Sequence, residues 1–303
     1  MRLLTRSDFD GLACAALLRE LGMIDSWKFT HPKDLQDGLI EVTSDDILAN
    51  VPYVPGAGMW FDHHSSEHER VGAVDFVGAS YVTDSAARVI YDYYDGDNKL
   101  PHMREMVEAV DKVDAAKLAR EEILSPEGWI LLGFLMDPRT GLGRFRNFRI
   151  SNYQLMEELM DACCVQSIDK ILANPDVKER IDTYFEQDAK FREMVSQHTT
   201  IHQNAILTDL RNVDPIYTGN RFIIYSLYPE QNISLWVVDG RNKQNCPIAV
   251  GHSVLNRTSK TDVGALMLKY GGGGHHQVGT CQVLYEDADR VIGELVMRMK
   301  ADG

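Results

Sequence analysis

Residues 2–21 read RLLTRSDFDGLACAALLREL and predict a strand, a turn and a helix in succession. The apolar residues before the turn have the length of a short strand, and the Ala- and Leu-rich run 12–21 has the composition of a helix. The turn between them carries two carboxylates, Asp8 and Asp10, at the end of the strand. In open α/β sheets, ligands bind in the crevice beyond the carboxyl ends of the strands. This stretch therefore predicts an α/β fold with a site near the two aspartates.

The rest of the chain extends this alternation. Up to residue 94 we expect strands at 26–30, 46–49 and 59–61 and a helix at 79–94, and beyond them helices over 101–170 and 175–197. Alternating strands and helices predict a mostly parallel sheet. After residue 204 we expect strands at 205–207, 222–227, 233–238, 247–254 and 283–284, helices at 261–270 and 288–300, and a glycine turn at 271–274. This pattern predicts a smaller C-terminal α/β domain with a mixed sheet.

The expected domain organisation places the active-site cleft between two domains. The predicted parts are a metal-binding catalytic domain (1–172), a connecting helix or linker (173–203) and a substrate-binding domain (204–303).

Composition limits the class of substrate and the compartment. The formal net charge of −14 opposes binding to long duplex nucleic acid, which needs a basic surface. The five cysteines include no C-x-x-C pair, which indicates a reducing compartment rather than a disulfide framework. No charged-then-apolar leader and no apolar run of about 18 residues is present, so we expect a cytoplasmic protein without a membrane partner.

Two further clusters carry groups that bind metals or phosphates. Asp62-His63-His64 follows the apolar strand 59–61 and supplies one carboxylate and two imidazoles. The glycines at 271–274, followed by His275, expose backbone N–H groups that can approach phosphate oxygens closely. Taken singly, each cluster is equally compatible with a polar turn or a solvated loop.

Together, the Asp8-Phe9-Asp10-Gly11, Asp62-His63-His64 and Gly272-Gly273-Gly274-His275 motifs resemble the DHH phosphoesterase family in order and spacing, over essentially the whole chain. The resemblance implies a metal-activated water, Mn²⁺ as the metal, two ions in the site, and Mg²⁺ or Co²⁺ as alternatives. It implies metal ligands at Asp8, Asp10, Asp62 and His63, and one more at Asp111 or Asp114, with Asp114 preferred.

The resemblance also implies roles at the substrate. Asp10, Asp62 and His64 are the expected catalytic residues, with His64 beside the phosphate. Arg257, Gly272, Gly273, Gly274 and His275 are the expected substrate-binding residues of the C-terminal domain. Arg139 and Arg144 flank a glycine-containing loop and are expected to add positive charge.

Two positions depart from the family pattern. Leu4 stands where many members have a metal-binding histidine, and Asn50 stands where many have an aspartate. We therefore expect either weaker binding of one metal ion or a substitute ligand, with His31, Asp45 or Asp46 as candidates.

The expected function is hydrolysis of short linear dinucleotides or oligonucleotides, including very short RNA. Exopolyphosphatase and cyclic-dinucleotide phosphodiesterase are the alternatives within the family, and the sequence leaves open whether the chain forms a homodimer. A haloacid-dehalogenase-type phosphatase would use Asp8 as a covalent nucleophile, but it leaves the second and third motifs unexplained. A non-catalytic nucleotide sensor is the alternative outside enzymes, and Leu4 and Asn50 are the residues that favour it.

Overall fold

The computed structural model describes residues 1–303, which divide into two compact units. The first unit consists of Met1–Lys117 and Ser125–Tyr184, and the second of Leu118–Leu124 and Phe185–Gly303. The long helix α11 (Pro175–Gln197) has the bounds expected from the sequence and contributes to both units. The three-part division made from the sequence stays a prediction.

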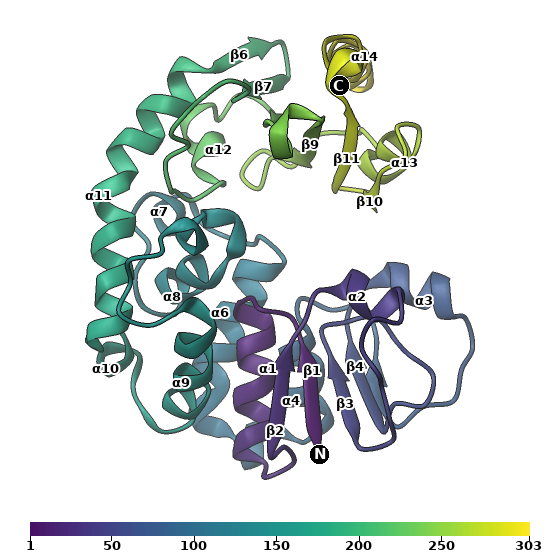
Figure 1. Ribbon diagram of the computed structural model, residues 1–303, viewed down its shortest axis with the longest axis vertical. Coiled ribbons are helices and arrows are strands. Elements are labelled where there is room, and N and C mark those ends of the chain that lie inside the picture. Colours follow the sequence, from purple (N-terminus) through teal and green to yellow (C-terminus); the bar gives the residue numbers. More distant parts are fainter. The chain divides into compact units, whose positions relative to one another are not determined.

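The first unit contains a sheet of five parallel strands, the N-terminal sheet, in the order β2-β1-β3-β4-β5 (Figure 1). Its strands are β1 (Arg2–Thr5), β2 (Ser26–Phe29), β3 (Asp46–Ala49), β4 (Met59–Asp62) and β5 (Gly78–Ser80). Arg2 lies level with Ser26 of β2 and Asp46 of β3, so the carboxyl ends of these strands meet at one edge. The predicted parallel α/β sheet is confirmed.

The helix α1 packs against β1, α4 and α9 on one side of this sheet (Figure 1). The helices before α11 are α1 (Phe9–Glu20), α2 (Pro32–Gln36), α3 (Ser65–Val71), α4 (Ala86–Tyr93), α5 (Gly96–Lys99), α6 (Arg104–Asp114), α7 (Arg120–Leu124), α8 (Gly128–Met136), α9 (Asn152–Val165) and α10 (Ile168–Leu172). None of the helices in the chain combines the length and the apolar composition that a membrane span requires.

The entry into α1 is tightly constrained. Asp8 is the N-cap, and its Oδ1 accepts a hydrogen bond of 2.9 Å from the backbone N–H of Gly11. A Cβ at position 11 would lie 2.0 Å from the carbonyl oxygen of Arg6, so only glycine fits. Residues Leu12–Leu18 are fully buried, which explains the small and aliphatic composition of the helix. The packing of α1 therefore fixes the positions of the two aspartates at its start.

The predicted helix over 79–94 is wrong in its first part. Residues 78–80 form the edge strand β5, and the helix α4 begins only at Ala86. Ser85 supplies the start signal, because its hydroxyl accepts a hydrogen bond from the backbone N–H of Arg88 at 3.0 Å.

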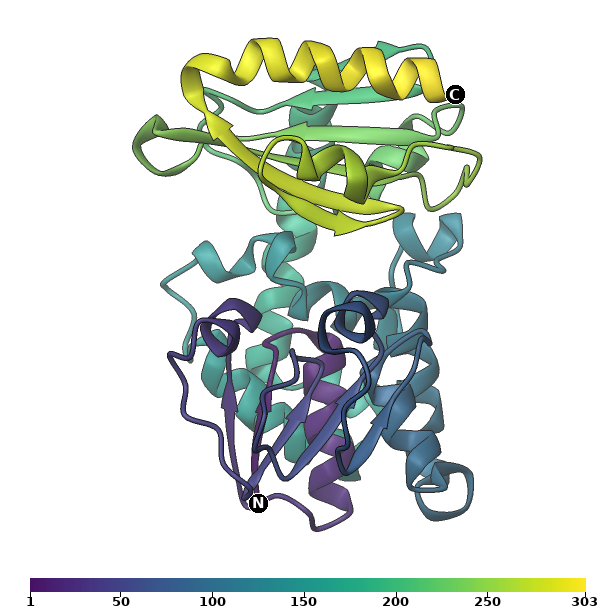
Figure 2. The ribbon, with the colours of Figure 1, turned by 90° about the vertical axis from the view of Figure 1, so that its right-hand side faces the viewer.

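The second unit contains a mixed sheet of six strands, the C-terminal sheet, in the order β10-β11-β9-β8-β7-β6. Its strands are β6 (Thr199–His202), β7 (Ala205–Asp209), β8 (Ile233–Val237), β9 (Asn245–His252), β10 (Gly273–His275) and β11 (Val278–Leu284). Only the β7–β8 pair is parallel. The helices are α12 (Ile223–Leu227), α13 (Val263–Leu268) and α14 (Ala288–Asp302), and α14 runs along this sheet (Figure 2). The predicted second, mixed sheet is confirmed.

Two local predictions in this unit are wrong. The expected strand 222–227 is instead the helix α12, preceded by its N-cap Phe222, since a short apolar run fits either state. The Asn220 side chain accepts a hydrogen bond from Phe222 N at 2.9 Å and so favours the helical turn. The glycine turn also ends earlier than expected, because Gly273 and Gly274 pair with β11 as part of β10.

Candidate metal centre

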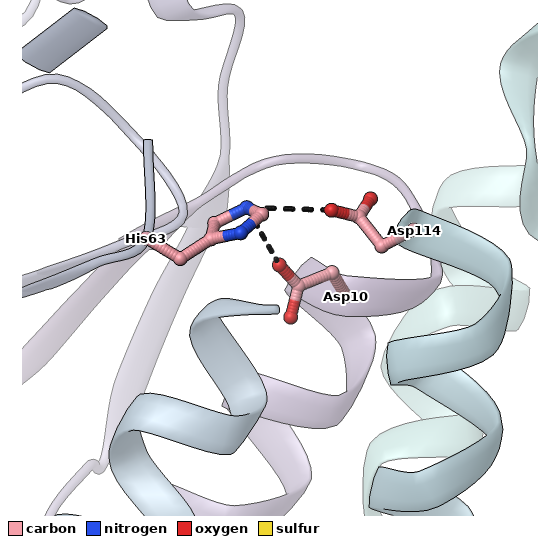
Figure 3. Close-up of side chains that lie close together, drawn as sticks. All are labelled: Asp10, His63 and Asp114. Atoms are coloured by element: carbon pink, nitrogen blue, oxygen red, sulfur yellow. Dashed lines mark ion pairs between the residues drawn. The ribbon is translucent and has the colours of Figure 1, made fainter. Parts of the chain in front are cut away.

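The structure brings Asp10, His63 and Asp114 together from three elements (Figure 3). Asp10 lies in the first turn of α1, His63 follows β4, and Asp114 ends α6. His63 Nε2 lies 3.8 Å from Asp10 Oδ2 and 3.3 Å from Asp114 Oδ2. The three ligand atoms lie within 4.8 Å of one another, which is close enough for one cation to contact all of them.

The histidine of this cluster has a buried nitrogen without a hydrogen bond. His63 Nδ1 lies 3.2 Å from the carbonyl oxygen of Thr83, to which it donates, so Nε2 carries the lone pair in the neutral imidazole. Nε2 is buried and makes no hydrogen bond, although it faces two carboxylates. Lone pairs facing one another in a buried place are unfavourable unless a cation lies between them. The donor set therefore fits a divalent metal ion.

Asp10 is held by the start of α4. Its two carboxylate oxygens accept backbone hydrogen bonds from Ala86 at 2.9 Å and from Ala87 at 2.8 Å. Burial, together with the negative charge of Asp114, raises the pKa of Asp10 to about 7. A cation bound between the two carboxylates would relieve this repulsion.

Asp8 lies beside the cluster, with both oxygens engaged. Oδ1 accepts from Gly11 N and, at 3.1 Å, from the side-chain amide of Asn50, while Oδ2 pairs with Arg6 Nε at 3.1 Å. Burial is the main cause of the raised pKa of Asp8. Asn50 Oδ1 is buried and has no hydrogen-bond partner. Asn50 thus occupies the place beside Asp8 without adding a negative charge.

Asp62 orients His64. The fully buried carboxylate accepts hydrogen bonds from His64 Nδ1 at 2.9 Å and from His64 N at 3.1 Å. Burial acts to lower the pKa of His64, but the hydrogen bond to Asp62 and its charge outweigh this effect and raise the pKa. The imidazole is therefore biased toward its cationic form, which suits a phosphate oxygen.

The two aspartates of α6 have different surroundings. Asp111 Oδ1 accepts from the Ser85 hydroxyl at 2.6 Å, and its Oδ2 accepts from Arg88 Nε at 2.9 Å and Nη2 at 2.7 Å. Asp111 thereby braces the start of α4, whose backbone N–H groups hold Asp10. Asp114, by contrast, belongs to the cluster itself.

This difference predicts unequal effects on metal binding. We expect Asp111→Asn to weaken Mn²⁺ binding by about 10-fold, as is typical for residues that orient ligands. Asp114→Asn, which removes a charge facing the cation, should weaken it further. Calorimetric titration with Mn²⁺ measures both, and an equal or larger loss in Asp111→Asn would contradict this assignment.

The departures from the family pattern have structural explanations. Leu4 packs in a hydrophobic cluster with Leu48 and Trp60.

The candidate substitute ligands lie elsewhere. Asp46 lies at the amino end of β3, where it pairs with Arg2 at 2.7 Å, and Asp45 precedes it. His31 caps α2 through a 3.2 Å hydrogen bond from Lys33 N. None of the three candidate substitutes (His31, Asp45 and Asp46) belongs to the cluster.

The residues expected to bind substrate lie in the second unit. Arg257 is exposed and its Nε donates to the Val254 carbonyl at 3.1 Å. Gly272 precedes β10, and Gly273, Gly274 and His275 form it. Gly272 has no room for a side chain, because a Cβ would lie 2.1 Å from the Thr280 carbonyl oxygen.

Two contributions to the site were missed in the sequence. The backbone N–H groups of Ala86 and Ala87 bind Asp10, and the Thr83 carbonyl fixes the His63 ring. Ser85 before an Ala-rich helix is an N-cap signal that could have located the first of these. A backbone carbonyl contact leaves no signal in the sequence.

The parallel sheet and the carboxylate–imidazole cluster beyond its strand ends define an α/β protein with a candidate divalent-metal centre. Among solved structures, the chain is similar to a pGpG-specific phosphodiesterase, PggH, from Vibrio cholerae, at 50% identity and a TM-score of 0.85, covering 100% of this chain and 99% of that one. The fold also matches a solved DHH domain at 13% identity and a TM-score of 0.58, covering 98% of this chain and 86% of that one. It further matches RecJ with Mn²⁺ from Thermus thermophilus at 10% identity and a TM-score of 0.50, covering 99% of this chain and 52% of that one.

The chain belongs to the DHH family of phosphoester-hydrolysing enzymes. A scan against family models and a search of curated proteins each gave no match.

Proposed function

We propose that this protein hydrolyses short linear dinucleotides of the pGpG type, with a divalent metal ion held by Asp10, His63 and Asp114. The observation that carries this proposal is the buried Nε2 of His63, which makes no hydrogen bond and lies close to two carboxylates. The similarity to a pGpG-specific phosphodiesterase, at 50% identity over the whole chain, supports the choice of substrate.

A bound divalent ion lowers the pKa of a water molecule and so supplies hydroxide for attack on phosphorus. The protein's part is to position the reacting groups. Asp10 is held in place by the start of α4, and Asp62 holds the His64 ring by two hydrogen bonds. His64, in its cationic form, would stabilise the negative charge that develops on a non-bridging oxygen.

The ligands favour Mn²⁺ as the metal. Two carboxylates favour a hard cation, and the imidazole of His63 suits Mn²⁺ better than Mg²⁺, which prefers oxygen ligands throughout. Two further assignments belong to this proposal: a second ion near Asp8, and phosphate contacts from Arg257 and the 272–275 segment.

A substrate panel tests the proposed function. With Mn²⁺ we expect turnover of pGpG, loss of activity with EDTA, and little turnover of a cyclic dinucleotide, a phosphorylated nucleoside or polyphosphate. Faster hydrolysis of polyphosphate would favour the exopolyphosphatase alternative. Binding of pGpG without turnover in Mn²⁺, Mg²⁺ and Co²⁺ would instead identify a nucleotide sensor.

Cytoplasmic location, activity on longer oligoribonucleotides, homodimer formation and a cleft between the two domains remain predictions from the sequence.

A further inference from the structure

One arginine of the first unit lies beside the acidic cluster. Arg139 lies in the short 3-10 helix η2 (Pro138–Thr140), directly after α8. It lines a small cavity together with Asp8, Asp10 and Asp114, and no other basic side chain lines that cavity. The cavity holds about 20 Å³, enough for roughly one water molecule.

The base of the Arg139 side chain is fixed. Asp137 caps η2, and its Oδ1 accepts hydrogen bonds from Arg139 N at 2.9 Å and from Arg139 Nε at 2.7 Å. Thr140 strengthens the same turn by donating its hydroxyl to the Phe134 carbonyl at 2.7 Å. The carboxylate of Asp137 is nearly buried, so this anchor is shielded from water.

The outer end of the guanidinium is available. The guanidinium bonds to Asp137 through Nε, Nη1 and Nη2 donate no hydrogen bond, and the side chain is 56% exposed. The other nearby arginine, Arg6, already directs its Nε to Asp8 at 3.1 Å. Arg139 is therefore an oriented cation with unused donors at the margin of a strongly negative site.

A phosphate group approaching Asp8, Asp10 and Asp114 meets repulsion from their carboxylates. Cations other than the metal ion reduce this repulsion, and the guanidinium fork binds two phosphate oxygens at once. We propose that Arg139 binds the non-bridging oxygens of the phosphate that is being cleaved, with Asp137 acting as the residue that positions it. This inference rests on the proposed function and names a substrate-binding residue of the same site.

The test compares Arg139→Gln and Arg139→Lys with the wild type, and uses Arg146→Gln as the matched control. Arg146 is exposed and makes no hydrogen bond or ion pair. Steady-state kinetics are measured with Mn²⁺ on pGpG and on GpG, which lacks the terminal phosphate. Calorimetry measures Mn²⁺ affinity and the binding of inorganic phosphate to the Mn²⁺-loaded protein.

For Arg139→Gln we expect kcat/KM to fall by about 10²-fold, as is typical for the loss of one donor to a reacting oxyanion. The factor should be the same for pGpG and GpG, and Arg139→Lys should restore part of it. Mn²⁺ affinity should stay unchanged or rise, because a cation beside the acidic cluster is removed. Arg146→Gln should behave as the wild type.

Three results would overturn the inference. A loss restricted to pGpG would place Arg139 at the terminal phosphate, a fall in Mn²⁺ affinity would make its role structural, and full activity would remove it from the site. If the wild type cleaves neither dinucleotide, the proposed function fails, yet inorganic phosphate still tests Arg139. Phosphate binding that is lost in Arg139→Gln would support the contact, and phosphate binding that is retained would refute it.

Discussion

Replacing Asp10 with Asn is expected to lower kcat/KM on the dinucleotide by about 10³-fold or more, the scale seen when a site loses a group that stabilises transition-state charge. The fully buried Asp10 carboxylate is one of three groups facing the candidate metal position. An amide of the same shape removes its negative charge. The amide also has one NH₂ group in place of a carboxylate oxygen. That group must face either the metal position or one of the backbone N–H groups of Ala86 and Ala87, and it can neither bind the cation nor accept from an N–H.

Metal titration separates this effect from a folding defect. We expect Asp10→Asn to bind Mn²⁺ much more weakly than the wild type while its circular dichroism in EDTA stays the same. Asp169→Asn is the matched control, since the side chain of this exposed aspartate makes no hydrogen bond or ion pair. Retention of Mn²⁺-dependent turnover in Asp10→Asn would refute the assignment of the metal centre.

Replacing Gly11 with Ala is expected to destabilise the first unit by about 3 kcal/mol, at the upper end of the usual cost of overpacking. The added Cβ would lie 2.0 Å from the Arg6 carbonyl oxygen and 3.0 Å from Thr5 Oγ1. Because the nearest atom belongs to the backbone, the clash is relieved only by moving α1 away from β1. That movement would break the hydrogen bond from Gly11 N to Asp8 and displace Asp10.

Calorimetric unfolding measures this prediction. A loss of about 3 kcal/mol corresponds to a melting temperature lowered by roughly 6–12 °C for a unit of this size. Gly293→Ala is the control, since nothing lies within 4 Å of its added Cβ on α14, and alanine should slightly stabilise the helix. An unchanged melting temperature in Gly11→Ala would show that the turn has more room than the structure indicates.

Much of the fold was predictable because it depends on local patterns. The strands β1 to β4 and the helix α11 follow from apolar runs and from composition, and the parallel sheet follows from their alternation. The helix α12 was mistaken for a strand, because a five-residue apolar run has no period long enough to distinguish the two. Local patterns fail where an element is short and its neighbours decide its state.

The sequence by itself placed Asp8, Asp10, Asp62 and His63 after strands whose ends meet at one edge of a parallel sheet, and the family resemblance added Asp111 or Asp114. The residue pattern alone does not distinguish Asp111 from Asp114, which lie three residues apart on α6, and the preference for Asp114 came from the family resemblance. Only the tertiary structure decided that Asp114 faces His63 while Asp111 braces Ser85 and Arg88. The reason is physical: the direction of a side chain on a helix depends on which elements pack against that helix, and these contacts join residues far apart in the chain.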